Sequence, residues 1–143
     1  MLSKIYERVP PDGEPLLKGP ETPLVDPRDG TLYALTEEAN LVRLDDFQTP
    51  DPTHPHNITA RCTVVVDLGV GRPLGGKITK NGEVYIADAL LGLVRIPDLS
   101  AERPRVEIVA SSLETSEGTS SILFADDLDV GPRTGHVYFS DGK

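Results

Sequence analysis

One short pattern recurs three times along the chain: Asn, Asp or Thr, then Gly, any residue, an apolar residue and Tyr. Its copies are Asp29-Gly30-Thr31-Leu32-Tyr33, Asn81-Gly82-Glu83-Val84-Tyr85 and the looser Thr134-Gly135-His136-Val137-Tyr138. The three tyrosines lie 52 and 53 residues apart. A period near fifty residues, in which each unit is a turn that leads into a β-rich segment, is typical of the blades of a β-propeller. The sequence therefore predicts an all-β propeller.

The length of the chain limits how much of a propeller it can form. A ring of blades closes with about four to eight of them, whereas 143 residues hold about two and a half units of this period. We predict a lead-in at 1–18, repeat one at 19–70, repeat two at 71–121 and an incomplete repeat three at 122–143. We expect the chain to be the N-terminal part of a longer protein.

Composition narrows the classes of partner. Lys and Arg together number 14 against 23 Asp and Glu, which gives a net charge of −9. Nucleic acids and anionic membranes require basic patches, so we expect no nucleic-acid partner. The chain has no apolar stretch of the length that spans a membrane, and no signal peptide is visible at its start. These features leave the cellular location open.

Alternation and turn residues predict four short strands in each complete repeat, and almost no helix. For repeat one the expected strands are 22–25, 31–36, 41–44 and 58–68. For repeat two they are 74–78, 83–87, 93–96 and 105–110. We expect a loop at 45–57, a flexible connection at 111–121, and a strand within 122–130 that opens repeat three.

The repeat also predicts which residues share a position in the ring. Glu21, Pro73 and Asp126 each stand twelve residues before a repeated tyrosine, at the start of a predicted inner strand. Inner strands line the channel of a propeller, so the carboxylates of Glu21 and Asp126 should face one mouth of the channel. Ca²⁺ takes six to eight oxygen ligands, and a ring of blades can supply them. Both residues are therefore candidate metal ligands; hydrogen bonding to nearby turn backbone is the alternative.

Several blocks, in this order and spacing, resemble a known family. They are Gly19-Pro20-Glu21, Gly71-Arg72-Pro73-Leu74-Gly75, Val84-Tyr85-Ile86-Ala87-Asp88-Ala89 with Gly92-Leu93, and Val137-Tyr138-Phe139-Ser140-Asp141. Together they resemble the strictosidine synthase-like family of six-bladed propellers, which includes the animal adipocyte plasma membrane-associated proteins. The resemblance runs from Gly19 to Asp141, and it implies six blades in the full-length protein.

The resemblance carries further expectations about the site. More distantly similar calcium-dependent lactonases and arylesterases use a first-blade Glu and a third-blade Asn as metal ligands, which correspond here to Glu21 and Asp126. The Asn of many members is thus an Asp in this chain, which keeps an oxygen ligand and adds a charge. Some members have a Cys where this chain has Val70, so we expect Cys62 to be unpaired. A secretory or endomembrane location is compatible with the resemblance.

The favoured function is metal-assisted hydrolysis of esters or lactones, so the expected partner is a small-molecule substrate. The alternatives are the condensation of an amine with an aldehyde, as in the alkaloid-forming members of the family, and a non-catalytic binding propeller. We expect the catalytic residues beyond Lys143. Arg72 is a candidate substrate-binding residue that would anchor an anion at the channel mouth, although pairing with a neighbouring carboxylate is the favoured alternative.

Overall fold

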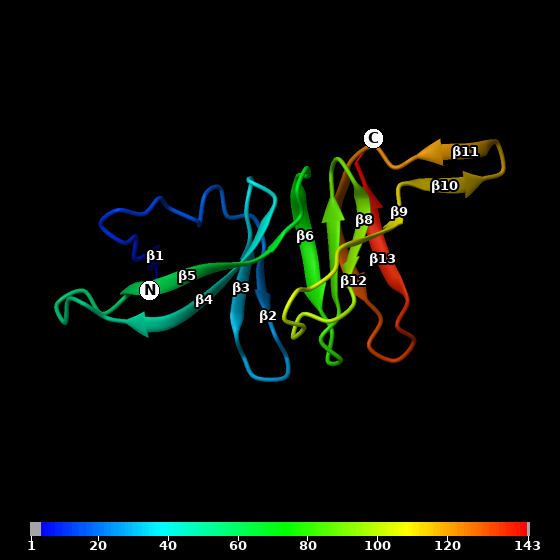
Figure 1. Ribbon diagram of the computed structural model, residues 1–143. Helices are drawn as coiled ribbons and strands as arrows, with labels where there is room; N and C mark the ends of the chain where they lie inside the picture. Colours follow the sequence, from blue (N-terminus) through cyan, green and yellow to red (C-terminus); the bar gives the residue numbers. More distant parts are fainter. Residues whose placement is uncertain (1–3, 143) are drawn as a thin grey trace.

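A computed structural model describes residues 4–142, which form thirteen strands and no helix (Figure 1). The strands are β1 Lys4–Glu7, β2 Pro23–Val25, β3 Leu32–Leu35, β4 Asn40–Gln48, β5 Asn57–Asp67, β6 Pro73–Ile78, β7 Val84–Asp88, β8 Gly92–Ile96, β9 Glu107–Ala110, β10 Ser112–Thr115, β11 Gly118–Ser121, β12 Ala125–Val130 and β13 Val137–Asp141. Residues 1–3 of the predicted lead-in, and Lys143, lie outside the described part. Within 4–142, no helix is present that could span a membrane.

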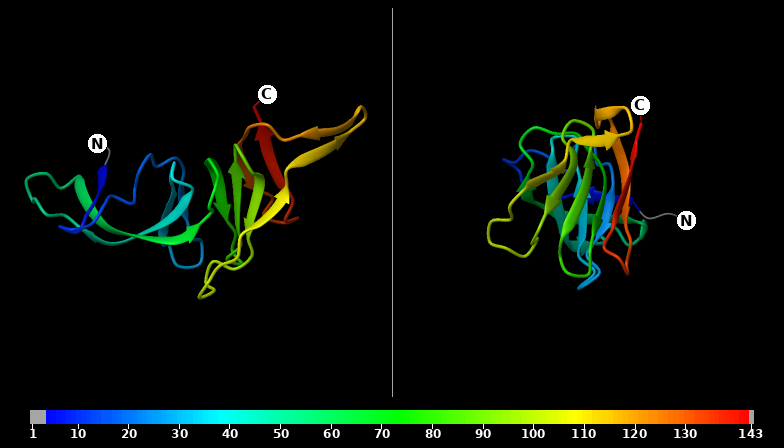
Figure 2. Two further views of the ribbon diagram at one scale, coloured as in Figure 1. Left: turned by 45° about the horizontal axis from the view of Figure 1, so that its top comes forward. Right: turned by 90° about the vertical axis from the view of Figure 1, so that its right-hand side faces the viewer.

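The strands form successive blades of a propeller. The first sheet has the order β1-β5-β4-β3-β2, the second has the order β6-β7-β8-β9, and β12 pairs with β13 to begin a third. Figures 1 and 2 show these three units side by side along the chain, with the long β4–β5 ribbon extending away from β6. The all-β fold and the count of about two and a half blades are confirmed. Six blades in a longer protein stays a prediction.

The repeated glycines form the turn that joins the first two strands of each blade. Gly30, Gly82 and Gly135 have φ angles of 80°, 84° and 70°. Side chains with a Cβ rarely adopt this region, so glycine is the residue that suits each turn. The tyrosine that follows pairs with the neighbouring strand in all three repeats, and the motif therefore marks the same place in each blade.

The two larger core clusters lie between blades, whereas a third and smaller cluster lies within the first blade. Leu35 and Leu41 of the first blade and Ile86 and Val94 of the second are all fully buried in one shared cluster. A second cluster joins the second blade to the third, and it contains Ala87, Leu93, Ile122, Ala125 and Leu128. Each sheet therefore buries its apolar faces by stacking on the next sheet, as propeller blades do.

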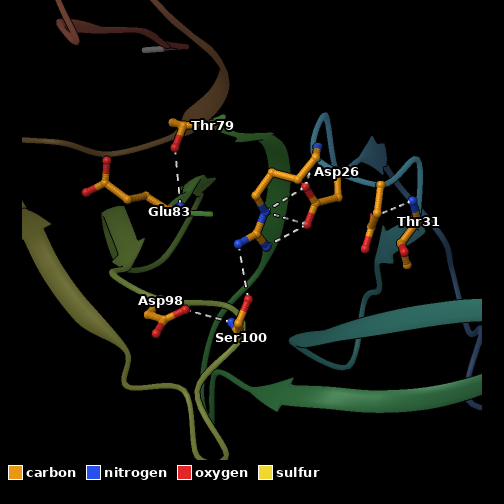
Figure 3. A network of polar contacts seen from close by, with 8 residues as sticks. Asp26, Thr31, Thr79, Glu83, Asp98 and Ser100 are labelled. Atoms are coloured by element: carbon orange, nitrogen blue, oxygen red, sulfur yellow. Dashed lines mark hydrogen bonds and ion pairs between the residues drawn. The ribbon is translucent and has the colours of Figure 1, made fainter. Parts of the chain in front are cut away.

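A polar contact joins the first two blades at the end where the inner strands finish (Figure 3). Arg28 donates to the buried carboxylate of Asp26 at 2.7 Å in its own turn, and it donates at 3.1 Å to the hydroxyl of Ser100 in the loop after β8. The guanidinium lies against Gly82, where a Cβ would clash with it. The turn of blade one is thereby fixed to blade two.

Three parts of the fold differ from the sequence expectation. β1 lies in the lead-in and pairs in parallel with β5, which no pattern in the sequence predicts. β4 continues to Gln48, so the predicted loop at 45–57 is shorter than expected. The connection at 111–121 is a hairpin of β10 and β11 rather than an irregular segment. The end of β4 and the β10–β11 hairpin are mostly exposed, so their strands pair without the alternation of apolar and polar residues that predicts a strand.

We predict that residues 1–143, produced by themselves, will aggregate or remain partly unfolded. The free edges of β9 and β13 carry unpaired backbone groups, and Ile108, Val109 and Tyr138 are exposed by 58%, 50% and 63%. Edges and apolar surface of this kind favour association between chains. Size-exclusion chromatography and thermal melting would measure the outcome. A soluble monomer that melts cooperatively would contradict the prediction.

A second prediction concerns Asp26, which is only 1% exposed. Hydrogen bonds from Arg28 hold its pKa below the ordinary value of 3.8. The ionised carboxylate therefore adds its full contribution to the free energy of unfolding above pH 3.8. This contribution is lost as the pH falls from 3.8 through the lower pKa of the folded protein. Asp26→Asn should lower the free energy of unfolding of the full-length protein by about 2 kcal/mol at neutral pH.

The same comparison at acidic pH provides the control. At about pH 3, below the ordinary pKa of 3.8, the carboxyl group of Asp26 binds a proton in the unfolded chain, so the ionised group adds less stability and the melting temperatures of wild type and Asp26→Asn should move closer together. A difference that stays constant between neutral and acidic pH would show that the charge of Asp26 is not the cause.

Candidate functional site

The predicted site residues lie at one end of the inner strands, where β2, β6 and β12 begin. We call this end the rim. Glu21 lies two residues before β2, Arg72 directly precedes β6, and Asp126 is the second residue of β12. The three residues come from three successive blades, so the fold gathers them along one side of the predicted channel.

Strand pairing corrects one of the three equivalent positions. Opposite the repeated tyrosines stand Leu24, Lys77 and Asp129. The residue three positions before each of these is Glu21, Leu74 and Asp126. Glu21 and Asp126 are therefore equivalent in register, but their counterpart in the second blade is Leu74 and not Pro73. The cause is the connection between β6 and β7, which is one residue shorter than in the other two blades.

Glu21 is held by its backbone and by an arginine of the next blade. Its N–H donates to the carbonyl of Leu35 at 2.9 Å. Its Oε1 accepts a hydrogen bond from Nη2 of Arg72 at 2.9 Å, and the side chain is 34% exposed. Nη1 of Arg72 lies 3.8 Å from Oε2 of Glu37. Arg72 thus pairs with a neighbouring carboxylate, the alternative that the sequence favoured.

Asp88 fixes the backbone that carries Arg72. Its Oδ1 accepts hydrogen bonds from the N–H groups of Arg72, Leu90 and Leu91, at 3.0, 2.8 and 2.9 Å. The carbonyl of Arg72 accepts a further bond from Ala89 at 2.9 Å. The position of Arg72 is therefore set by the buried end of β7, and only its side chain is free to move.

The second oxygen of Asp88 is enclosed by the chain. Oδ2 is buried and has no hydrogen-bond partner within the described residues. A Cβ at Gly71 would lie 2.5 Å from it, so glycine is required there for the backbone to pass the carboxylate. Sequence reasoning used the Tyr-Ile-Ala-Asp block only as a mark of resemblance and did not assign Asp88 a role. Its place three residues after the repeated tyrosine is the signal that could have found it.

The third blade repeats this arrangement. Asp141 also stands three residues after a repeated tyrosine, and its Oδ1 accepts the N–H groups of Phe124 at 2.8 Å and Leu123 at 3.2 Å. These residues directly precede β12, which carries Asp126. In the first blade the corresponding residue is Thr36, which instead bonds to Asn40. In the second and third blades, an aspartate thus holds the backbone just before the inner strand through hydrogen bonds.

Asp126 lies on an exposed part of the rim. Its side chain is exposed, and within 4–142 its carboxylate makes no hydrogen bond or ion pair. The neighbouring Asp127 packs against Gly75, where a Cβ would lie 2.6 Å from the Cα of Asp127. This close approach brings the start of β12 against β6, and so places Asp126 beside the second blade.

These carboxylates do not form a complete metal cluster. Among the residues that the structure describes, no group of three or more His, Cys, Asp or Glu side chains is arranged to hold a metal ion. Cys62 is unpaired, as expected, and burial raises the pKa of its thiol to about 11. The thiol is therefore a poor ligand or nucleophile at neutral pH.

A cavity of about 450 Å³ lies at the opposite end of the inner strands. It is formed between the β6–β7 and β12–β13 turns, and its lining includes Lys77, Lys80, Tyr85, Val130 and Arg133. None of Glu21, Arg72 and Asp126 lines it. The rim remains the candidate site because it gathers two carboxylates at equivalent positions and an arginine.

Comparison with known proteins identifies the family. A scan against protein-family profiles finds no match. An Arabidopsis thaliana protein, strictosidine synthase-like 9, is 31% identical over 130 residues, which are 87% of this chain and 33% of that protein. Strictosidine synthase-like 2 of Arabidopsis thaliana is 39% identical over 74 residues, which are 51% of this chain and 18% of that protein. The chain belongs to the strictosidine synthase-like family.

Other relatives agree with this membership. The adipocyte plasma membrane-associated protein of Salmo salar is 34% identical over 73 residues, which are 51% of this chain and 17% of that protein. The match spans at most a third of the length of these relatives. A solved gluconolactonase from Xanthomonas campestris superposes with a TM-score of 0.58 at 16% identity, over 93% of this chain and 40% of that chain. This likeness shows the propeller fold.

We predict that Asp88→Ala will lower the free energy of unfolding of the full-length protein by about 3 kcal/mol, because three backbone N–H groups lose their charged acceptor. Asp88→Asn keeps an oxygen acceptor and should retain more than half of the stability that is lost in Asp88→Ala. Unfolding in urea would measure both variants, with exposed Asp12→Ala as the control. If Asp88→Ala were as stable as the control, Asp88 would have no role in fixing the rim.

Proposed function

We propose that this strictosidine synthase-like protein is a metal-assisted hydrolase of esters or lactones, with Glu21 and Asp126 as ligands of a Ca²⁺ ion at the rim. The observation that carries the proposal is the equivalent register of these two carboxylates where the inner strands of the first and third blades begin. The gluconolactonase with the same fold supports lactones as a substrate class.

The residues present fit part of such a site. Oε2 of Glu21 has no hydrogen bond within the described residues, and Asp126 has a free carboxylate. Both supply the hard oxygen atoms that Ca²⁺ prefers, but two side chains are too few for its usual six to eight ligands. The remaining ligands would come from water and from blades beyond this chain, which spans at most a third of its matched relatives.

The chemistry follows from what each group can do. Bound Ca²⁺ would supply a Lewis acid that polarises a carbonyl oxygen of the substrate. Glu21 and Asp126 would hold the ion, and Arg72 would offer N–H donors to a negatively charged part of the substrate. The acid or base that moves the proton is expected outside this chain.

Calcium-dependent stability of the full-length protein tests the site. Ca²⁺ should raise the melting temperature, because a ligand that binds only the native state stabilises it by about 2.7 kcal/mol at a hundredfold excess over Kd. Glu21→Gln and Asp126→Ala should each remove most of this response. Hydrolysis of a panel of aryl esters and lactones, with and without a chelator, would show whether the same ion supports activity.

His54→Ala is the matched control, because His54 lies in the exposed β4–β5 connection and contacts Asp51 there. This variant should respond to Ca²⁺ as the wild type does. Equal stabilisation of the wild type and both rim variants would reject the metal site. Calcium binding without hydrolysis of any ester or lactone would favour a non-catalytic propeller.

A further inference from the structure

Arg72 lies between two carboxylates of the first blade at unequal distances. Its Nη2 is 2.9 Å from Oε1 of Glu21, which is a hydrogen bond, whereas its Nη1 is 3.8 Å from Oε2 of Glu37, which is a looser ion pair. All three side chains are partly exposed, by 42%, 34% and 50% for Arg72, Glu21 and Glu37. The stronger of the two contacts therefore goes to the proposed metal ligand.

The second carboxylate is held close to the first. The N–H of Glu37 donates to the carbonyls of Lys18 and Gly19, both at 3.2 Å. The side chain of Glu37 packs against Gly19, where a Cβ would lie 2.6 Å from its carboxylate. Gly19 precedes Glu21 by two residues. The Gly-Pro-Glu block thus brings a second acceptor for Arg72 next to the metal ligand.

Arg72 and a bound divalent cation would both interact with the carboxylate of Glu21. A guanidinium and Ca²⁺ are both cations, and their repulsion disfavours both on one carboxylate. Asp126 would contribute a second negative charge to the ion but none to Arg72. The backbone of Arg72 is fixed by Asp88 and Ala89, so the arginine can leave Glu21 only by rotating its side chain.

We propose that Arg72 is an internal competitor of Ca²⁺ for Glu21, and that metal binding transfers its guanidinium to Glu37. This inference rests on the proposed function, because it takes Glu21 as a metal ligand. In the metal-free protein Arg72 neutralises Glu21 and joins the first two blades. In the metal-bound protein it stays at the rim, paired with Glu37, and sets the affinity of the site for calcium.

Calorimetric titration of the chelator-treated full-length protein with Ca²⁺ tests the competition. Arg72→Gln should bind Ca²⁺ on the order of tenfold more tightly than the wild type, because the competitor is gone. Glu37→Gln should bind more weakly, since Arg72 then has no second partner. In the Arg72→Gln background the Glu37→Gln change should lose most of its effect, which a double-mutant cycle measures.

A second readout needs no titration. Arg72→Gln should lower the melting temperature of the metal-free protein, because Glu21 and Glu37 then lack their counter-ion. With saturating Ca²⁺ this loss should largely disappear, since the ion has already replaced Arg72 at Glu21. Arg28→Gln is the matched control: Arg28 also joins the first two blades but lies at the other end of the strands. It should destabilise both states equally and leave the Kd unchanged.

The outcomes separate the two proposals. If Glu21→Gln loses calcium binding while Arg72→Gln binds with the wild-type Kd or more weakly, the competition is wrong and the metal site stands. If Glu21→Gln binds Ca²⁺ as the wild type does, or neither protein binds it, the metal site and the competition are both rejected.

Discussion

The structure depends on the burial of each sheet against the next one. Leu35 and Leu41 of the first blade share a cluster with Ile86 and Val94 of the second, and Ala87 and Leu93 continue into a cluster with the third. Burial of apolar surface is the dominant favourable term in folding. Because a single blade leaves both faces exposed, each blade needs neighbours, and the inner strands of successive blades are brought together.

Close stacking at the inner strands produces the rim. Gly75 allows the start of β12 to approach β6, and the hydroxyl of Thr22 donates across the first interface to the carbonyl of Leu74. Arg72 adds an ion pair across the same interface. The candidate site therefore lies beside close contacts between successive blades. This coincidence also explains why polar residues at the rim affect both stability and the proposed ligand binding.

Much of the fold could be predicted from the sequence because its signals are local. The turn glycines and the tyrosines after them recur at a nearly constant period. This repeat shows which residues occupy the same position in successive blades. Glu21 and Asp126 could be matched in this way. Pro73 was matched wrongly, because spacing counts residues and cannot detect a shorter connection between β6 and β7. Strand pairing shows Leu74 at that position instead.

By itself, the sequence determined the all-β class, the repeating blade and the two equivalent carboxylates, since periodicity and turn chemistry depend only on neighbours along the chain. Only the tertiary structure decided that Arg72 bonds to Glu21 and lies near Glu37, and that β1 joins the edge of β5. These contacts join residues distant in sequence, and their geometry follows from how the blades stack. The role of Asp88 also needed the fold, because its partners are backbone N–H groups that no sequence pattern displays.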